Sequence, residues 1–245
     1  MSPVFFLLLA GALQAGGAGT TVEQVHGRAR ELLEGKGKAA DALAVLEEGL
    51  KMHPKAEALH RLAGIAAFRE RNFERARVAF ETAISLKPEE PFNYVKLASL
   101  HVCERGDARA ADQVLARLFD LRPRDVASRE EAAAMWAKCG ETDRAISLWL
   151  ALARLDPPQA WMYRFKAGQL YHAGGRYQDA RSLLGRALAD GPKSSAALAA
   201  QLGATLARMG EKTEAARLYR MALARRPDAV LRQRLETELG ALQAR

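Results

Sequence analysis

Cysteine and aromatic residues are scarce in this sequence, and both scarcities narrow the possible classes of protein. Only two of the 245 residues are cysteine, and Phe, Trp and Tyr together make up 7%. Two cysteines cannot build a disulfide framework or a four-ligand zinc site. Ala and Leu supply most of the apolar residues, which favours helices over strands. The sequence therefore predicts an all-α protein, and its 49% of hydrophobic residues exclude a disordered chain.

The signatures of common catalytic sites are also missing. The sequence contains no glycine-rich phosphate-binding loop, no G-x-S-x-G nucleophile motif and no H-E-x-x-H zinc motif. Its histidines are scattered along the chain, at His26, His53, His60, His101 and His172. We therefore expect a protein that is not an enzyme, with no catalytic residue, no cofactor and no bound metal.

The positive charge says little about a partner. The formal net charge is +8, from 37 basic and 29 acidic residues, and 27 of the basic residues are arginine. An excess of Arg and Ala can arise from the base composition of the coding DNA, and acids such as Glu104 and Glu130 are interspersed. A nucleic-acid-binding protein would concentrate its basic residues on one surface, so no specific nucleic-acid partner is expected.

The first residues differ from the rest of the chain. Residues 1–22 carry no charged side chain, and the apolar run over residues 4–13 has the length of a signal-peptide core. Small residues follow at positions 15–19, although a basic start is missing. We expect residues 1–19 to be a signal peptide that engages the membrane only during export, which makes the protein periplasmic or secreted. The alternative is an uncleaved membrane anchor.

Six of the nine prolines recur at spacings of 34 or 35 residues: Pro54, Pro88, Pro123, Pro157, Pro192 and Pro227. Twelve residues before each lies an alanine: Ala42, Ala76, Ala111, Ala145, Ala180 and Ala215. Seventeen residues before five of them lies a glycine: Gly37, Gly106, Gly140, Gly175 and Gly210. Arg71 stands at the sixth of these places. Because these internal spacings are fixed, we expect the extra residue of a 35-residue unit to follow its proline.

Each of these residue types has a local role. Glycine ends a first helix in the left-handed conformation, and alanine lets the second helix approach its neighbour closely. Proline ends the second helix, because it cannot continue the backbone hydrogen bonds. The sequence therefore predicts six helix–turn–helix units.

This pattern resembles the tetratricopeptide repeat family. The second unit carries Gly64, Ala76, Phe80, Ala83 and Pro88 at the small, small, large, small and proline positions. The fifth and sixth units fit similarly, whereas the third has Ser99 in place of the early glycine. The resemblance implies a right-handed superhelical solenoid of six repeats, with units over residues 22–54, 55–88, 89–123, 124–157, 158–192 and 193–227.

Both ends of the repeat array carry residues that are typical of the start of a helix. Thr20 and Glu23 have the spacing of a capping box before the first helix, so the array is expected to begin near residue 20. Residues 228–245 are expected to form a C-terminal capping helix that begins at Asp228. Its apolar stripe consists of Leu231, Leu235, Leu239 and Leu242. The alternative role for this helix is oligomerisation, and the oligomeric state is left open.

The resemblance also implies where a partner binds. In the family, set positions of the first helices line a concave groove. In this sequence the candidates form two sets, and the members of the front set are Arg61, Arg69, Asn93 and Lys96. The members of the back set are Met162, Phe165, Gln169 and His172. In the sixth unit the same positions are alanines: Ala197, Ala200, Ala204 and Ala207. The front set suits an acidic or carboxylate-bearing segment, and the back set suits an apolar anchor with polar edges.

The expected function is a non-catalytic, exported protein–protein interaction scaffold that holds a peptide or partner protein in this groove. By family analogy it serves envelope assembly or secretion. Two alternatives stay open: an accessory subunit of a catalytic complex, and a nucleic-acid-binding helical repeat.

Overall fold

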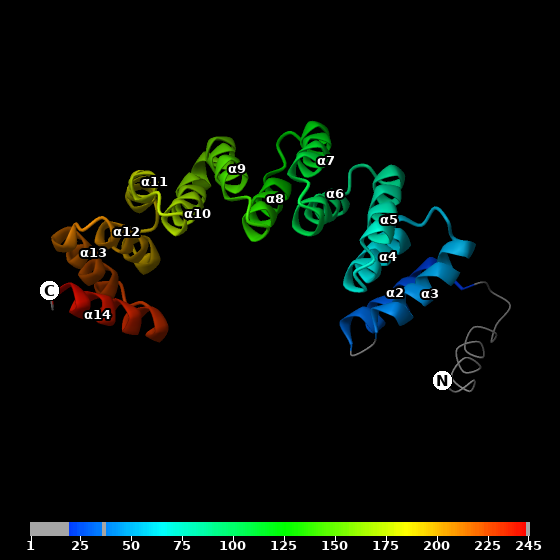
Figure 1. Ribbon diagram of the computed structural model, residues 1–245, viewed down its shortest axis with the longest axis horizontal. Coiled ribbons are helices and arrows are strands. Elements are labelled where there is room, and N and C mark those ends of the chain that lie inside the picture. The colour runs from blue at the N-terminus through cyan, green and yellow to red at the C-terminus, as the bar shows by residue number, and fades with distance from the viewer. Residues whose placement is uncertain (1–19, 36–37, 244–245) are drawn as a thin grey trace. The chain divides into compact units, whose positions relative to one another are not determined.

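The computed structural model describes residues 20–35 and 38–243, so the expected signal peptide and Gly37 lie outside the described residues. Within those two ranges there are thirteen α-helices and no strand. The helices, labelled in Figure 1, belong to two compact units. The first unit ends at Arg122 and the second begins at Pro123. This confirms the all-α class and the helix–turn–helix repeats.

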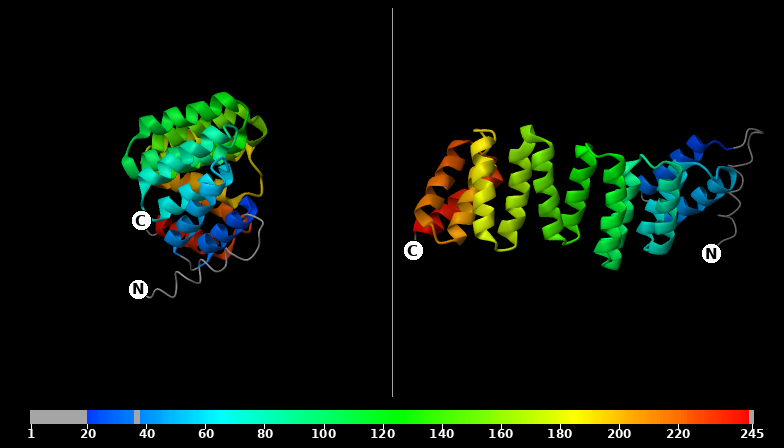
Figure 2. Two further views of the ribbon diagram at one scale, coloured as in Figure 1. Left: turned by 90° about the vertical axis from the view of Figure 1, so that its right-hand side faces the viewer. Right: turned by 90° about the horizontal axis from the view of Figure 1, so that it is seen from above.

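Unit 1 contains three helix pairs that lie side by side (Figure 2). The pairs are α2 (Val22–Glu34) with α3 (Ala39–Met52), α4 (Glu57–Arg69) with α5 (Phe73–Leu86), and α6 (Pro91–Ser99) with α7 (Ala108–Leu121). A π-helical turn, Leu100–Glu104, continues α6. Each second helix of unit 1 ends two residues before a periodic proline, as the pattern predicts.

Unit 2 contains three further pairs and a final single helix. The pairs are α8 (Val126–Lys138) with α9 (Thr142–Leu155), α10 (Ala160–Ala173) with α11 (Tyr177–Asp190), and α12 (Ala196–Arg208) with α13 (Lys212–Ala224). A short 3-10 turn, Pro157–Gln159, precedes α10. The final helix, α14 (Ala229–Gln243), lies beside α12 and α13 in Figure 1. Asp228 caps it as predicted, because its carboxylate accepts from the Leu231 N–H at 2.8 Å.

Small residues bring the two helices of a repeat together. The periodic alanines are all fully inaccessible to solvent: Ala42, Ala76, Ala111, Ala145, Ala180 and Ala215. In the second repeat the early Gly64 faces the ring of Phe80, and a Cβ added to the glycine would lie 2.6 Å from a ring atom. The same arrangement recurs between Gly203 and Tyr219. The glycine therefore leaves the room that the large side chain of the second helix fills.

The turns within the repeats need a left-handed residue. Gly106, Gly140, Gly175 and Gly210 have φ between 68° and 85°. Arg71 adopts the same conformation with φ of 58°, although its side chain makes this unfavourable. Its guanidinium lies 5.6 Å from the centre of the Phe73 ring, which offsets part of the strain.

Replacing Arg71 by glycine should therefore raise the free energy of unfolding by about 0.5–1 kcal/mol, because glycine relieves the strain of a positive φ. Urea denaturation of the full chain measures the change. Arg71→Ala is the matched control, since it removes the guanidinium and keeps the strained backbone. A glycine variant no more stable than the alanine variant would contradict this explanation.

Two sequence predictions need correction. The capping box of α2 consists of Thr21 and Gln24 and not of Thr20 and Glu23, so the helix begins one residue later. In the third repeat the extra residue does not follow the proline. It lies in the first helix, where the π-helical turn after Ser99 accommodates one residue more than an α-helical turn.

Candidate functional site

An aromatic ring flanked by two cations forms on the first helices of unit 1. Arg61 of α4 has its guanidinium carbon 5.6 Å from the centre of the Phe92 ring. Lys96 of α6 has its ammonium nitrogen 5.1 Å from the same centre. Phe92 and Arg61 are partly exposed, and Lys96 is exposed. Attraction of both cations to the ring holds them near one another on the surface.

The carboxylate of Glu57 positions one of the cations. Glu57 Oε1 lies 3.5 Å from Arg61 Nε and accepts a hydrogen bond of 2.9 Å from Asn93 Nδ2. The charges of Arg61, Lys96 and Glu57 together leave a net charge of +1. Among the described residues, Arg61 Nε and Asn93 Oδ1 are buried without a hydrogen-bond partner. We call Glu57, Arg61, Phe92 and Lys96 the Phe92 face.

Asn93 is not on the surface where the sequence placed it. Its exposed fraction is 0%, the same as that of Leu59 in the second repeat. Each of these residues lies two positions after the first residue of its helix. When the repeat positions are counted back from Gly106 with the spacing of the other repeats, Asn93 is assigned to the groove surface. The π-helical turn adds one residue between Asn93 and Gly106, so that assignment is shifted by one residue. Asn93 therefore supports Glu57 from below, and Phe92 and Glu57 are the residues that the count missed.

Arg69 is separate from the Phe92 face. It lies at the end of α4, and its Nη1 donates a hydrogen bond to the backbone carbonyl of Leu33 in the last turn of α2. An arginine at this position satisfies a carbonyl that the helix itself leaves unpaired. Its contact therefore joins the first two repeats.

The predicted back set lies on α10 in unit 2. Phe165 and Gln169 line a cavity of about 160 Å³ together with residues of α12 and α14. The other lining residues are Ala197, Ala200, Gln201, Leu231, Arg234, Leu235 and Glu238. Met162 is partly exposed and does not line this cavity. The sequence had placed Phe165 and Gln169 on one helix face, and the structure places α14 on the other side of the cavity that this face lines.

His172 joins two helices of unit 2. Thr205 Oγ1 donates to the Gln201 carbonyl at 2.9 Å, so it accepts from His172 Nδ1 at 3.0 Å. Burial, and then the charges of Arg208 and Arg234, lower the pKa of His172 below its usual value of 6.5. The lowered pKa favours the neutral imidazole, and its hydrogen bond with Thr205 links α10 to α12.

The alanines expected in the groove of the sixth repeat are partly covered. Ala200 and Ala204 are buried in a cluster with Leu235 of α14, and Leu231 and Leu239 pack against the same cluster. Ala197 is exposed, and it lines the cavity described above. The C-terminal helix thus occupies part of the surface that the sequence assigned to a partner.

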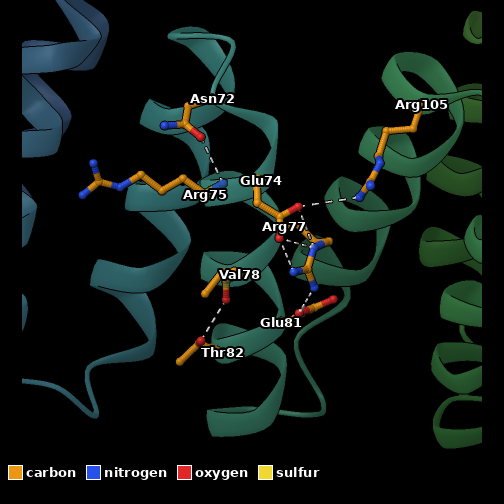
Figure 3. Close-up of polar contacts among 8 residues, drawn as sticks. All are labelled: Asn72, Glu74, Arg75, Arg77, Val78, Glu81, Thr82 and Arg105. Atoms are coloured by element: carbon orange, nitrogen blue, oxygen red, sulfur yellow. Dashed lines mark hydrogen bonds and ion pairs between the residues drawn. The ribbon is translucent and has the colours of Figure 1, made fainter.

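Many arginines outside the Phe92 face are paired with acids. Figure 3 shows this on α5, where Arg77 pairs with Glu74 and with Glu81, the second pair at 2.6 Å. Arg105 approaches the same Glu74 at 3.8 Å. Hydrogen bonds from Arg77 to both carboxylates raise the pKa of its guanidinium further. Such local pairing reduces the positive potential that a nucleic acid would require.

No group of three or more His, Cys, Asp or Glu side chains in residues 20–35 and 38–243 could hold a metal ion. None of the helices in these ranges is both long and apolar enough to cross a membrane.

Comparisons with known proteins agree with this architecture. A tetratricopeptide repeat family model matches residues 28–91, 138–197 and 165–230. None of the curated proteins compared with the chain matches it significantly.

Among solved structures, a tetratricopeptide repeat protein from Parabacteroides merdae ATCC 43184 is similar over 96% of this chain and 90% of its own. Its TM-score is 0.55 and its identity 16%. Naa15/Naa10 bound to HypK-THB matches over 98% of this chain and 35% of that chain, with a TM-score of 0.57 and 19% identity. Yeast Tom70 matches over 90% and 46% respectively, with a TM-score of 0.55 and 15% identity. At these identities the likeness concerns the fold alone.

Proposed function

Because the chain belongs to the tetratricopeptide repeat family, we propose that it is a non-catalytic, exported scaffold that binds a peptide or a segment of a partner protein. The binding surfaces are the faces of its first helices. This repeat fold supports protein–protein interaction, since stacked helix pairs present an extended surface and need no further domain.

The observation that carries the proposal is the Phe92 face. It combines an accessible aromatic ring with two cations, and arginine and aromatic residues are the side chains that most often dominate binding energy at interfaces. Its net charge of +1 suits a partner segment with a carboxylate, because guanidinium and ammonium groups form strong hydrogen bonds with that group. Glu57 holds Arg61 in place before the partner arrives.

The apolar leader supports export, and family analogy suggests a role in envelope assembly or secretion. Protein purified from the envelope of the source cell should therefore lack the leader over residues 1–19, because signal peptidase removes such segments. Intact-mass measurement decides the point. A mass equal to that of all 245 residues would instead support the uncleaved anchor.

Affinity capture from the cell envelope, followed by mass spectrometry, tests the function itself. The full chain should retain a defined partner protein, and Arg61→Glu should lose it. The matched control is Arg109→Glu, which reverses an exposed charge on the second helix α7. If all three proteins capture the partner equally, the Phe92 face is not the binding site. If the full chain captures nucleic acid and no protein, the proposed scaffold function is wrong and the nucleic-acid-binding alternative takes its place.

A further inference from the structure

The C-terminal helix lies on the face of unit 2 that would receive a partner. Leu235 is its most buried side chain and packs with Ala200 and Ala204 of α12. These two alanines are at the positions that the family uses for its groove. Leu231 and Leu239, four residues before and after Leu235, pack against the same cluster. The helix thus presents an apolar stripe to an alanine-lined surface.

Contacts of α14 extend beyond its sequence neighbours. The cavity of about 160 Å³ has walls from α10, α12 and α14. The charges of Arg234 and Glu238 also influence His172, which belongs to α10. A polar latch fixes the helix, because the Tyr219 hydroxyl donates to Glu238, which pairs with Arg234 at 2.8 Å. The helix therefore packs on the sixth repeat and faces α10 of the fifth repeat across this cavity.

This helix is held less firmly than the others. Of its fifteen residues only Leu235 is buried, whereas every other α-helix in the described ranges buries at least three. Val230 is 81% exposed. The link to α13 passes through Arg226, whose φ of 54° is unfavourable for a side-chain-bearing residue. The cavity beside Phe165 leaves contacts unmade, which further weakens the attachment.

We propose that α14 is an internal competitor for this face, and that the partner's segment is an amphipathic helix with leucines at four-residue spacing. Resting on the proposed scaffold function, this inference names the class of ligand for unit 2. The leucines of the partner helix take the places of Leu231, Leu235 and Leu239. An acidic residue three positions after the central leucine accepts the hydrogen bond from Tyr219, as Glu238 does. Binding requires α14 to leave, so the fraction of open molecules limits the apparent affinity.

A peptide with the sequence of residues 229–243 is the probe, labelled with a fluorophore and added to the full chain. Leu235→Ala loosens α14 without changing the face of α12, and this variant should bind the probe about tenfold more tightly than the wild type, because more molecules are open. Val230→Ala is the matched control on the exposed side of the same helix and should bind like the wild type. A probe carrying Leu235→Ala should bind neither protein.

Glu238→Ala provides a second variant, because it removes the latch and keeps the leucines. Circular dichroism shows that each variant is folded. Folded variants that bind the probe no better than the wild type overturn the proposal. Sedimentation that shows dimers of the loosened variants also overturns it, since α14 then exchanges between copies. The assay needs no partner, so its failure leaves the capture test of the Phe92 face unaffected.

Discussion

Gly168→Ala is expected to lower the free energy of unfolding by about 1–3 kcal/mol, the cost of overpacking a closely packed interior. Gly168 of α10 faces Leu184 of α11, and an added Cβ would lie 2.7 Å from Leu184 Cγ and 2.9 Å from Cδ2. Leu184 is fully buried, so it has little room to move away. The helices must separate or Leu184 must leave its preferred conformation.

Gly185→Ala in the same repeat is the matched control with the opposite expected sign. A Cβ at Gly185 meets no atom within 4 Å, and the residue lies inside α11. Alanine there should stabilise the protein by about 0.5–1 kcal/mol, because glycine is the poorer helix former. Urea denaturation of both variants measures the two changes. Equal stability of the two variants would show that the closeness of α10 and α11 does not depend on Gly168.

The repeat architecture could be predicted because each position follows local rules. The prolines and alanines keep their spacing in all six repeats, and four of the described turns between paired helices hold a left-handed glycine. Even Arg71, which stands in place of the periodic glycine, adopts the positive φ that its position in the repeat requires. Because the same residue preferences recur at the turns and helix ends of successive repeats, the sequence predicts the helix pairs.

The surface was less predictable, since it depends on register and on tertiary packing. One extra residue in the π-helical turn moved Asn93 into the core and brought Phe92 to the surface. No local signal marks that turn. Counted from the start of α6, the small position that Gly64 occupies in α4 belongs to the buried Ala98 and not to Ser99. Likewise, the leucine stripe predicted a capping helix, but its periodicity does not show that the helix reaches toward α10 and borders Phe165.

Reversing the charge of Arg61 should have the largest effect on partner binding. Arg61→Glu changes the summed charge of positions 57, 61 and 96 from +1 to −1 and places a second carboxylate beside Glu57. A partner segment that carries a carboxylate is then repelled, so we expect binding to weaken about tenfold or more. Phe165→Ala should weaken binding at unit 2 by removing apolar contact area.

The two variants differ in how salt should affect them. Charges on an exposed face are screened at about 0.15 M salt over a distance of roughly 8 Å. Wild-type binding through the Phe92 face should therefore weaken as salt rises, and the difference between wild type and Arg61→Glu should shrink. The loss caused by Phe165→Ala should stay nearly constant, because apolar contacts carry no charge to screen. Titration of the captured partner at several salt concentrations, together with thermal melting of each variant, measures both effects. If folded Arg61→Glu binds like the wild type at low salt, the partner does not engage the Phe92 face through charge.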